Sequence, residues 1–218
     1  MAKKIGIAAL VLLVAAALVL GVLWRRATAL PEWYEQAALV TEDGSLAVDQ
    51  DWVQIPLSEA PQGPRGAKPS AAEPGEEVYQ LRNPHMRALK GKKNGEQLSK
   101  VVKQSRAVYK KKRKQIEAGA VINMSKLDPS KLSAKDRKTY DNLVEAFPAL
   151  TGRDVYLGVE GDVRKEGDKI VFGPGAKLVI GKTKYSMRSA ARQLGMSEDK
   201  LRRELGKELG KFKIKLPS

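Results

Sequence analysis

The stretch of the chain with the clearest binding chemistry is a run of five consecutive cations, Lys110, Lys111, Lys112, Arg113 and Lys114. Such a run neutralises phosphate or carboxylate groups and releases their counterions, which favours binding to anionic surfaces or polymers. No aromatic residue is interleaved with the cations, so stacking on nucleic-acid bases is not available to them. A solvated surface segment is the alternative, because charge runs are common on protein surfaces. We interpret the five residues as a candidate anion-binding site.

The distribution of charge supports an anionic partner. The 218-residue chain has a formal net charge of +15. Residues 86–150 hold 17 basic and 6 acidic side chains, and residues 151–218 hold 16 and 9. The positive field therefore belongs to the C-terminal part, where it would attract lipid headgroups, an acidic wall polymer or nucleic acid.

Other kinds of chemistry have little support. There is no Cys, which excludes disulfides and thiol catalysis, and His85 is the single histidine, so a His/Cys metal cluster cannot form. No set of side chains has the pattern of an acid–base or nucleophilic site. We therefore expect no enzymatic activity, no cofactor, no metal site and no small-molecule substrate.

A second candidate site is the segment AARQLGMSEDKLRREL, in which Ala191, Gly195 and Leu201 have a characteristic spacing. Residues 188–205 resemble a bacterial helix-turn-helix motif. The resemblance implies that Lys200, Arg202 and Arg203 lie on a recognition helix facing DNA. An ordinary two-helix corner packed on a sheet has the same signals, with Gly195 ending one helix and Ser197 capping the next. Nucleic-acid binding is accordingly the alternative to the anion-binding interpretation.

The N-terminal region predicts a membrane anchor. After a short N-terminus, residues 1–4, the run from 5 to 24 contains no charged residue and no Pro, and it is as long as the roughly 20 residues that span a bilayer. A cleaved signal peptide is the alternative, with a small-residue site at 27–29. Lys3 and Lys4 favour an N-inside, single-pass signal-anchor with the rest of the chain extracytoplasmic. Ala17 and Gly21 form a small-xxx-small pair of the kind found in homodimers.

The remaining chain predicts an α+β fold. We expect a juxtamembrane segment over residues 25–60 and a flexible linker over 61–95, which is rich in Pro and Gly at its start. A basic domain follows over 96–218, with a small, mostly antiparallel sheet packed on two to four helices. Its expected helices are listed here with their ranges: 96–117, 133–146, 186–194 and 197–209. Its expected strands are 120–124, 154–160, 169–172, 177–180 and 211–216.

Together these features predict a single-pass protein of a bacterial envelope, held in the inner membrane, that binds or scaffolds through a basic extracytoplasmic domain. The alternative function is a membrane-tethered nucleic-acid-binding regulator that uses residues 188–205.

Overall fold

The computed structural model describes residues 29–34, 46–59, 75–89, 99–166, 169–211 and 216–217. The apolar run 5–24, most of the Pro- and Gly-rich segment and residues 212–215 of the expected last strand lie outside the described residues. In the described part of the chain, no helix has the length and apolar character needed to cross a membrane. The predicted fold class, with its N-terminal transmembrane helix, and the single-pass signal-anchor interpretation are therefore corrected. That prediction rested on the apolar length of one segment, which says nothing of its tertiary placement.

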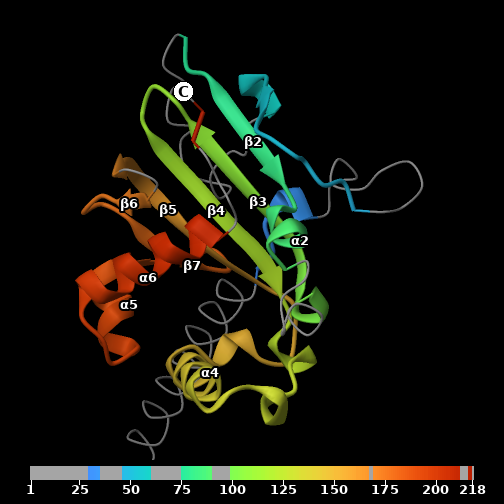
Figure 1. Ribbon diagram of the computed structural model, residues 1–218, viewed down its shortest axis with the longest axis vertical. Coiled ribbons are helices and arrows are strands. Elements are labelled where there is room, and N and C mark those ends of the chain that lie inside the picture. The colour runs from blue at the N-terminus through green and yellow to red at the C-terminus, as the bar shows by residue number, and fades with distance from the viewer. Residues whose placement is uncertain are drawn as a thin grey trace, which may run out of the picture.

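An eight-stranded antiparallel sheet forms the centre of the molecule (Figure 1). Its strands are β1 (Val53–Ile55), β2 (Val78–Arg82), β3 (Val102–Lys110), β4 (Gln115–Ile122), β5 (Val155–Glu166), β6 (Lys169–Phe172), β7 (Lys177–Ile180) and β8 (Thr183–Ser186). Their order is β1-β2-β3-β4-β5-β7-β8. The long strand β5 pairs first with β7 and then, beyond Gly161, with β6. The α+β class is as expected, but the sheet is larger than predicted.

The helices are α2 (Pro84–Leu89), α4 (Ala134–Ala146), α5 (Met187–Gln193) and α6 (Glu198–Lys211), with the 3-10 turns η1 (Glu32–Tyr34), η3 (Leu57–Glu59), η4 (Met124–Lys126), η5 (Pro129–Lys131) and η6 (Pro148–Leu150). Local signals place several of them as predicted. Ser133 caps α4 by accepting a hydrogen bond from the Asp136 backbone N–H. Gly195, at a φ of 63°, ends the α5 turn, and Ser197 accepts from the Lys200 N–H at 3.3 Å.

The helix predicted over 96–117 is wrong. Residues 102–122 are instead the β3–β4 hairpin, with Lys110 opposite Gln115 and four turn residues between them. The interior of β3 is buried without a break from Ser105 to Tyr109, which a strand at the centre of a sheet allows on both faces. Pairing with β2 and β4 therefore overrides the helix propensity of the Lys-rich sequence.

Part of the predicted linker 61–95 is also integral to the fold. Residues 78–82 form β2, which pairs with β1 on one side and β3 on the other. Val78 and Leu81 are each 1% exposed. The folded unit therefore begins well before residue 96, the start of the predicted domain, because β1 and β2 come from the preceding sequence.

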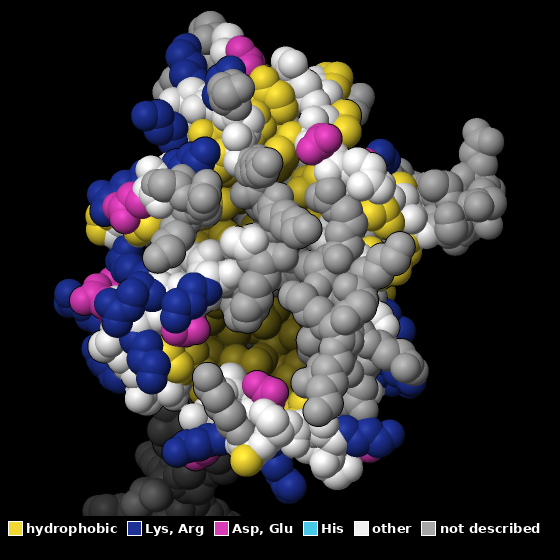
Figure 2. Space-filling view, viewed as in Figure 1, with side chains coloured by type: hydrophobic (Ala, Val, Ile, Leu, Met, Phe, Trp, Pro, Cys, Tyr) yellow, Lys and Arg dark blue, Asp and Glu magenta, His cyan; other side chains and the backbone are white. Residues whose placement is uncertain are grey.

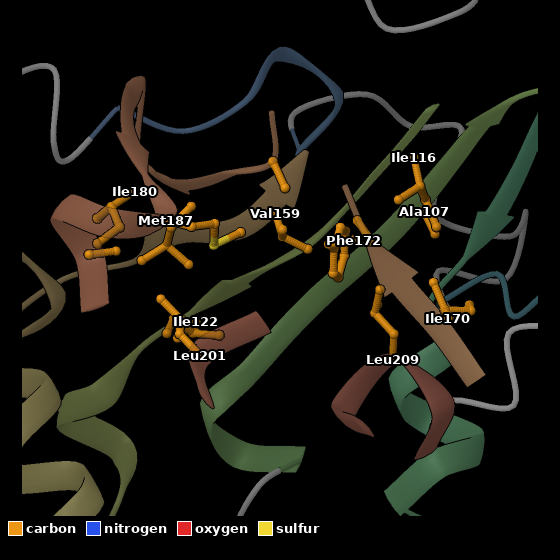
Figure 3. Close-up of a cluster of buried hydrophobic side chains, with 14 of the residues drawn as sticks. Ala107, Ile116, Ile122, Val159, Ile170, Phe172, Ile180, Met187, Leu201 and Leu209 are labelled. Atoms are coloured by element: carbon orange, nitrogen blue, oxygen red, sulfur yellow. The ribbon is translucent and has the colours of Figure 1, made fainter. Parts of the chain in front are cut away.

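One face of the sheet packs against the helices. Figure 3 shows Ala107, Ile116 and Val159 directed from the strands into a cluster of buried apolar side chains that includes Met187 of α5 and Leu201 of α6. In Figure 2, which has the same orientation, Lys and Arg side chains gather along the left edge, and a hollow with an apolar floor lies below the middle. The helices α5 and α6 thus cover one face of the sheet, and the opposite face has different neighbours.

On that opposite face, the described helical turn is η1. Trp33 of η1 is buried and packs edge-on against Tyr156 of β5, with ring centroids 5.9 Å apart. Val121 and Val179 complete this small cluster. The Tyr34 hydroxyl donates to Asp154 at 3.1 Å, which fixes the turn at one end of the face. The other end of the same face carries charged side chains.

Candidate anion-binding site

The five cations predicted as a site occupy the β3–β4 hairpin. Lys110 is the last residue of β3, and residues 111–114 form the turn, with Lys114 at a φ of 50°. Two of the five make ion pairs with the segment before β2: Arg113 Nε lies 3.3 Å from Glu76 Oε2, and Lys111 Nζ lies 3.4 Å from Glu77 Oε2. Only some of the five cations are therefore available to bind a partner.

Arg113 has a structural role that the sequence pattern does not suggest. The Glu76 side chain is 2% exposed, and the same carboxylate accepts a hydrogen bond from the Lys112 backbone N–H at 2.9 Å. A carboxylate this buried requires a charge partner, which Arg113 supplies. Helix geometry would have spread these cations around a cylinder, whereas the hairpin directs Lys110 to the open face of the sheet and Arg113 to Glu76.

A charged pocket of about 310 Å³ lies beside Lys110 on the face of the sheet opposite α5 and α6. Its wall is built by β3, β4, β5, β7, β8 and the β6–β7 turn, which contribute Val108, Lys110, Gln115, Ile116, Glu117, Glu160, Gly161, Asp162, Gly175, Lys177 and Lys184. Alternation along the strands puts the charged residues on the same face. Three lysines and three carboxylates thus meet in a volume at the lower end of the range for small-molecule sites.

The centre of the pocket is a pair of glutamates. Glu117 of β4 and Glu160 of β5 are directly opposite in the antiparallel register, which places their Cβ atoms roughly 5 Å apart. Lys184 of β8 forms an ion pair with Glu160, with Nζ 2.7 Å from Oε2. Lys177 is opposite Glu160 on the other side. The row Glu117, Glu160 and Lys177 therefore crosses the sheet from β4 to β7.

The pKa of Glu117 is raised, chiefly by burial and then by the charge of Glu160. Lys184, Lys110 and Arg106 act in the opposite direction, in that order. Burial disfavours the ionised carboxylate because protein groups replace water around it. The carboxyl group of Glu117 therefore takes up a proton more readily than that of an exposed glutamate.

An aromatic ring and a buried guanidinium adjoin the glutamates. A Cβ on Gly119 or Gly158 would lie 2.5 Å from the Tyr156 hydroxyl, so the phenol ring lies flat across these two glycines. Burial is the main cause of the raised pKa of Tyr156, followed by the charges of Glu117 and Glu160. Arg106, 7% exposed, donates to Gln80, and burial lowers its pKa.

The three candidate DNA-facing residues, Lys200, Arg202 and Arg203, differ in their exposure and contacts. The Arg202 guanidinium donates to the Gly173 and Pro174 carbonyl oxygens, the latter at 3.0 Å, and pairs with Glu198. It thereby fastens α6 to the β6–β7 turn, and its side chain is 15% exposed. Lys200 and Arg203 are exposed. Of the three residues proposed to face DNA, one is committed to internal carbonyl groups, so nucleic-acid binding through this helix stays a prediction with weaker support.

A separate polar cluster surrounds His85. Its Nδ1 lies 2.6 Å from Ser105 Oγ, and Asn83 bonds both to Ser105 N–H at 3.0 Å and to the Ala47 carbonyl at 2.7 Å. His85 is 2% exposed, and burial lowers its pKa to about 4. This cluster ties the segment before β1 to β3. In the described residues, no group of three or more acidic or His side chains is placed to hold a metal ion.

Sequence reasoning missed the pocket because its charged residues come from five strands separated by up to about 75 positions. The available signal was the alternation in β5, which puts Glu160 and Asp162 on the face opposite Val155, Leu157 and Val159. The register that brings them beside Glu117 is not encoded locally.

Comparison of the chain with protein-family models, with curated proteins and with solved structures gave no match.

Proposed function

We propose that this protein is a binding domain whose charged pocket takes an oxyanion group, such as a phosphate, sulfate or carboxylate, of an acidic ligand. The observation that carries the proposal is the convergence of Lys110 and Lys177 on one pocket from β3 and β7. Three strand spacings separate them, roughly 14 Å between backbones. Their long side chains can approach a common group from both sides.

The two lysines differ from most other cations of the site in their contacts. Lys184 is engaged with Glu160, and Lys111 and Arg113 are engaged with Glu77 and Glu76. Among the residues that the structure describes, no ion pair is formed by Lys110 or Lys177. An oxyanion between them would satisfy both charges, and lysine binds such groups as a point charge.

The pocket size favours a single anionic group over an extended polymer segment. A volume of about 310 Å³ admits one phosphate or carboxylate with the part of the ligand that carries it. A polymer could still present its groups one at a time, helped by the net charge of +15. In both cases the group that enters the pocket is an oxyanion.

The test is titration of the full chain with sodium sulfate and with polyphosphate at constant ionic strength. The double variant Lys110→Gln/Lys177→Gln should bind sulfate at least tenfold more weakly than the wild type, which is about 1.4 kcal/mol. The matched control is Lys138→Gln/Lys165→Gln, which removes the same charge from exposed positions on α4 and near the end of β5.

A selective loss in the pocket variant supports the proposal. Equal weakening in both double variants would show that overall charge, not the pocket, binds the anion, and would overturn it. Polyphosphate that binds far more tightly than sulfate, and is lost in the pocket variant alone, would identify a polymeric source of the oxyanion.

A further inference from the structure

We propose that the pocket binds its oxyanion together with one proton, which Glu117 holds while Glu160 stays paired with Lys184. The bound oxyanion then accepts a hydrogen bond from the Glu117 carboxyl group. The inference rests on the proposed function, and it specifies the ligand as an oxyanion with a free acceptor oxygen. The proton comes from solvent and returns there when the ligand leaves.

Glu117 and Glu160 are close enough that the charge of each affects the protonation of the other. They are opposite each other on adjacent antiparallel strands, and like charges in that arrangement are destabilising. Lys184 relieves the repulsion by pairing with Glu160 at 2.7 Å. Glu117 is left facing the pocket from the middle of the sheet, with Val108 opposite it on β3.

The charged and titratable groups around Glu117 come from every neighbouring strand. They are Arg106 and Lys110 on β3, Tyr156, Glu160 and Asp162 on β5, Lys177 on β7 and Lys184 on β8. Asp162 accepts a hydrogen bond from Gln115 at 3.0 Å. Burial and Glu160 favour the neutral form of Glu117 against the combined effect of Lys184, Lys110 and Arg106.

A bound oxyanion changes this balance in one direction. It lies between Lys110 and Lys177, so it offsets the charge of Lys110, one of the cations that favour ionised Glu117, and it adds a negative charge of its own. Both effects favour protonation of a nearby carboxyl group. By linkage, the anion must then bind more tightly at lower pH, by up to about tenfold per pH unit for one linked proton.

The experiment is isothermal titration of the full chain with sodium sulfate between pH 5.5 and 8.5. Each pH is measured in two buffers that differ in ionisation enthalpy, which gives the number of protons taken up. Sulfate is the probe because it stays a dianion over this range, whereas phosphate itself titrates. We expect the wild type to take up as much as about one proton and its affinity to fall as pH rises.

Glu117→Gln is the deciding variant, because the amide has the same shape, stays neutral and keeps a donor toward the ligand. It should bind sulfate with no linked proton from this position and with a nearly pH-independent affinity. Thermal unfolding checks that it folds. Glu160→Gln is the second variant: it removes the like charge, so the pH at which affinity begins to fall should shift downward.

The outcomes are distinguishable from those of the proposed function. Sulfate binding with the same proton uptake in the wild type and in Glu117→Gln would overturn the proton-coupled inference while leaving the binding site intact. Absence of sulfate binding at every pH would overturn the proposed function itself. Uptake in the wild type that disappears in Glu117→Gln supports both.

Discussion

His85 should make the stability of this protein depend on pH in a defined direction. It is the only histidine, and the chain has no Cys, so few other groups titrate between pH 5 and pH 7.5. The ring is 2% exposed, Nδ1 contacts Ser105 Oγ, and Nε2 is buried without a hydrogen-bond partner among the described residues. Protonation would place a charge in this site and make both ring nitrogens donors, and Nε2–H would have no acceptor among the described residues.

The magnitude follows from the two pKa values. Burial lowers the pKa of His85 to about 4 in the folded protein, against an ordinary value of 6.5. Above pH 6.5 the ring is neutral in both states and the stability is complete. As pH falls from 6.5 toward 4, His85 binds a proton in the unfolded chain but not in the folded protein. The free energy of unfolding should therefore drop by about 2 kcal/mol between pH 7.5 and pH 5, and by about 3 kcal/mol in all.

The assay is urea unfolding of the wild type and His85→Gln at a series of pH values, followed by circular dichroism. Glu117 has a raised pKa, so its own contribution to stability decreases as pH rises and runs opposite to that of His85. The two residues lie on different faces of the sheet, so subtracting the variant from the wild type at each pH removes the Glu117 contribution.

We expect the stability advantage of the wild type over His85→Gln to shrink by about 2 kcal/mol between pH 7.5 and pH 5. A difference that stays constant over this range would refute the argument, because it would mean that the folded protein tolerates the protonated ring. A difference that grows toward low pH would show that the ring gains a proton on folding.

Three further changes test the packing around the sheet. Leu201→Ala should destabilise the protein by about 2–5 kcal/mol in urea unfolding, because this side chain is 6% exposed in the main core. Arg202→Ala should cost about 1–3 kcal/mol by leaving carbonyl groups of the β6–β7 turn unpaired, while Arg203→Ala, an exposed neighbour, should change stability by less than about 0.5 kcal/mol; equal effects would contradict the assigned contact. Gly119→Ala should lower the melting temperature, since its Cβ would lie 2.5 Å from the Tyr156 hydroxyl. Adding Tyr156→Phe to this variant should restore little of the lost stability, because the ring carbons lie 2.6 Å from the same Cβ.

Some elements of this protein are determined by short stretches of sequence. Ser133 begins α4, and Gly195 and Ser197 form the corner between α5 and α6, as the capping rules predict. Gly173, Pro174 and Gly175 connect β6 to β7. These features are predictable because the groups that stabilise them are neighbours in the chain, so the local sequence contains the whole interaction.

The basic run shows where local reasoning fails. The residues from 96 to 117 have the composition of a helix, yet residues 102–110 are a central strand. Residues 102–110 form a strand because β2 pairs with one edge of β3 and β4 pairs with the other. The five cations can be read directly from the sequence, but the directions of their side chains depend on a strand and a turn rather than on a helix.

The candidate site is determined almost entirely by tertiary structure. The charges of Lys110, Glu117, Glu160 and Lys177 can be read from the sequence, but their proximity depends on the strand order β3-β4-β5-β7 and on its register. A register shift of one residue would turn each of these side chains to the opposite face. The sequence by itself thus determined the local turns, caps and the net positive charge. The sheet decided which charges meet in one pocket, because antiparallel pairing joins residues that are distant in the chain.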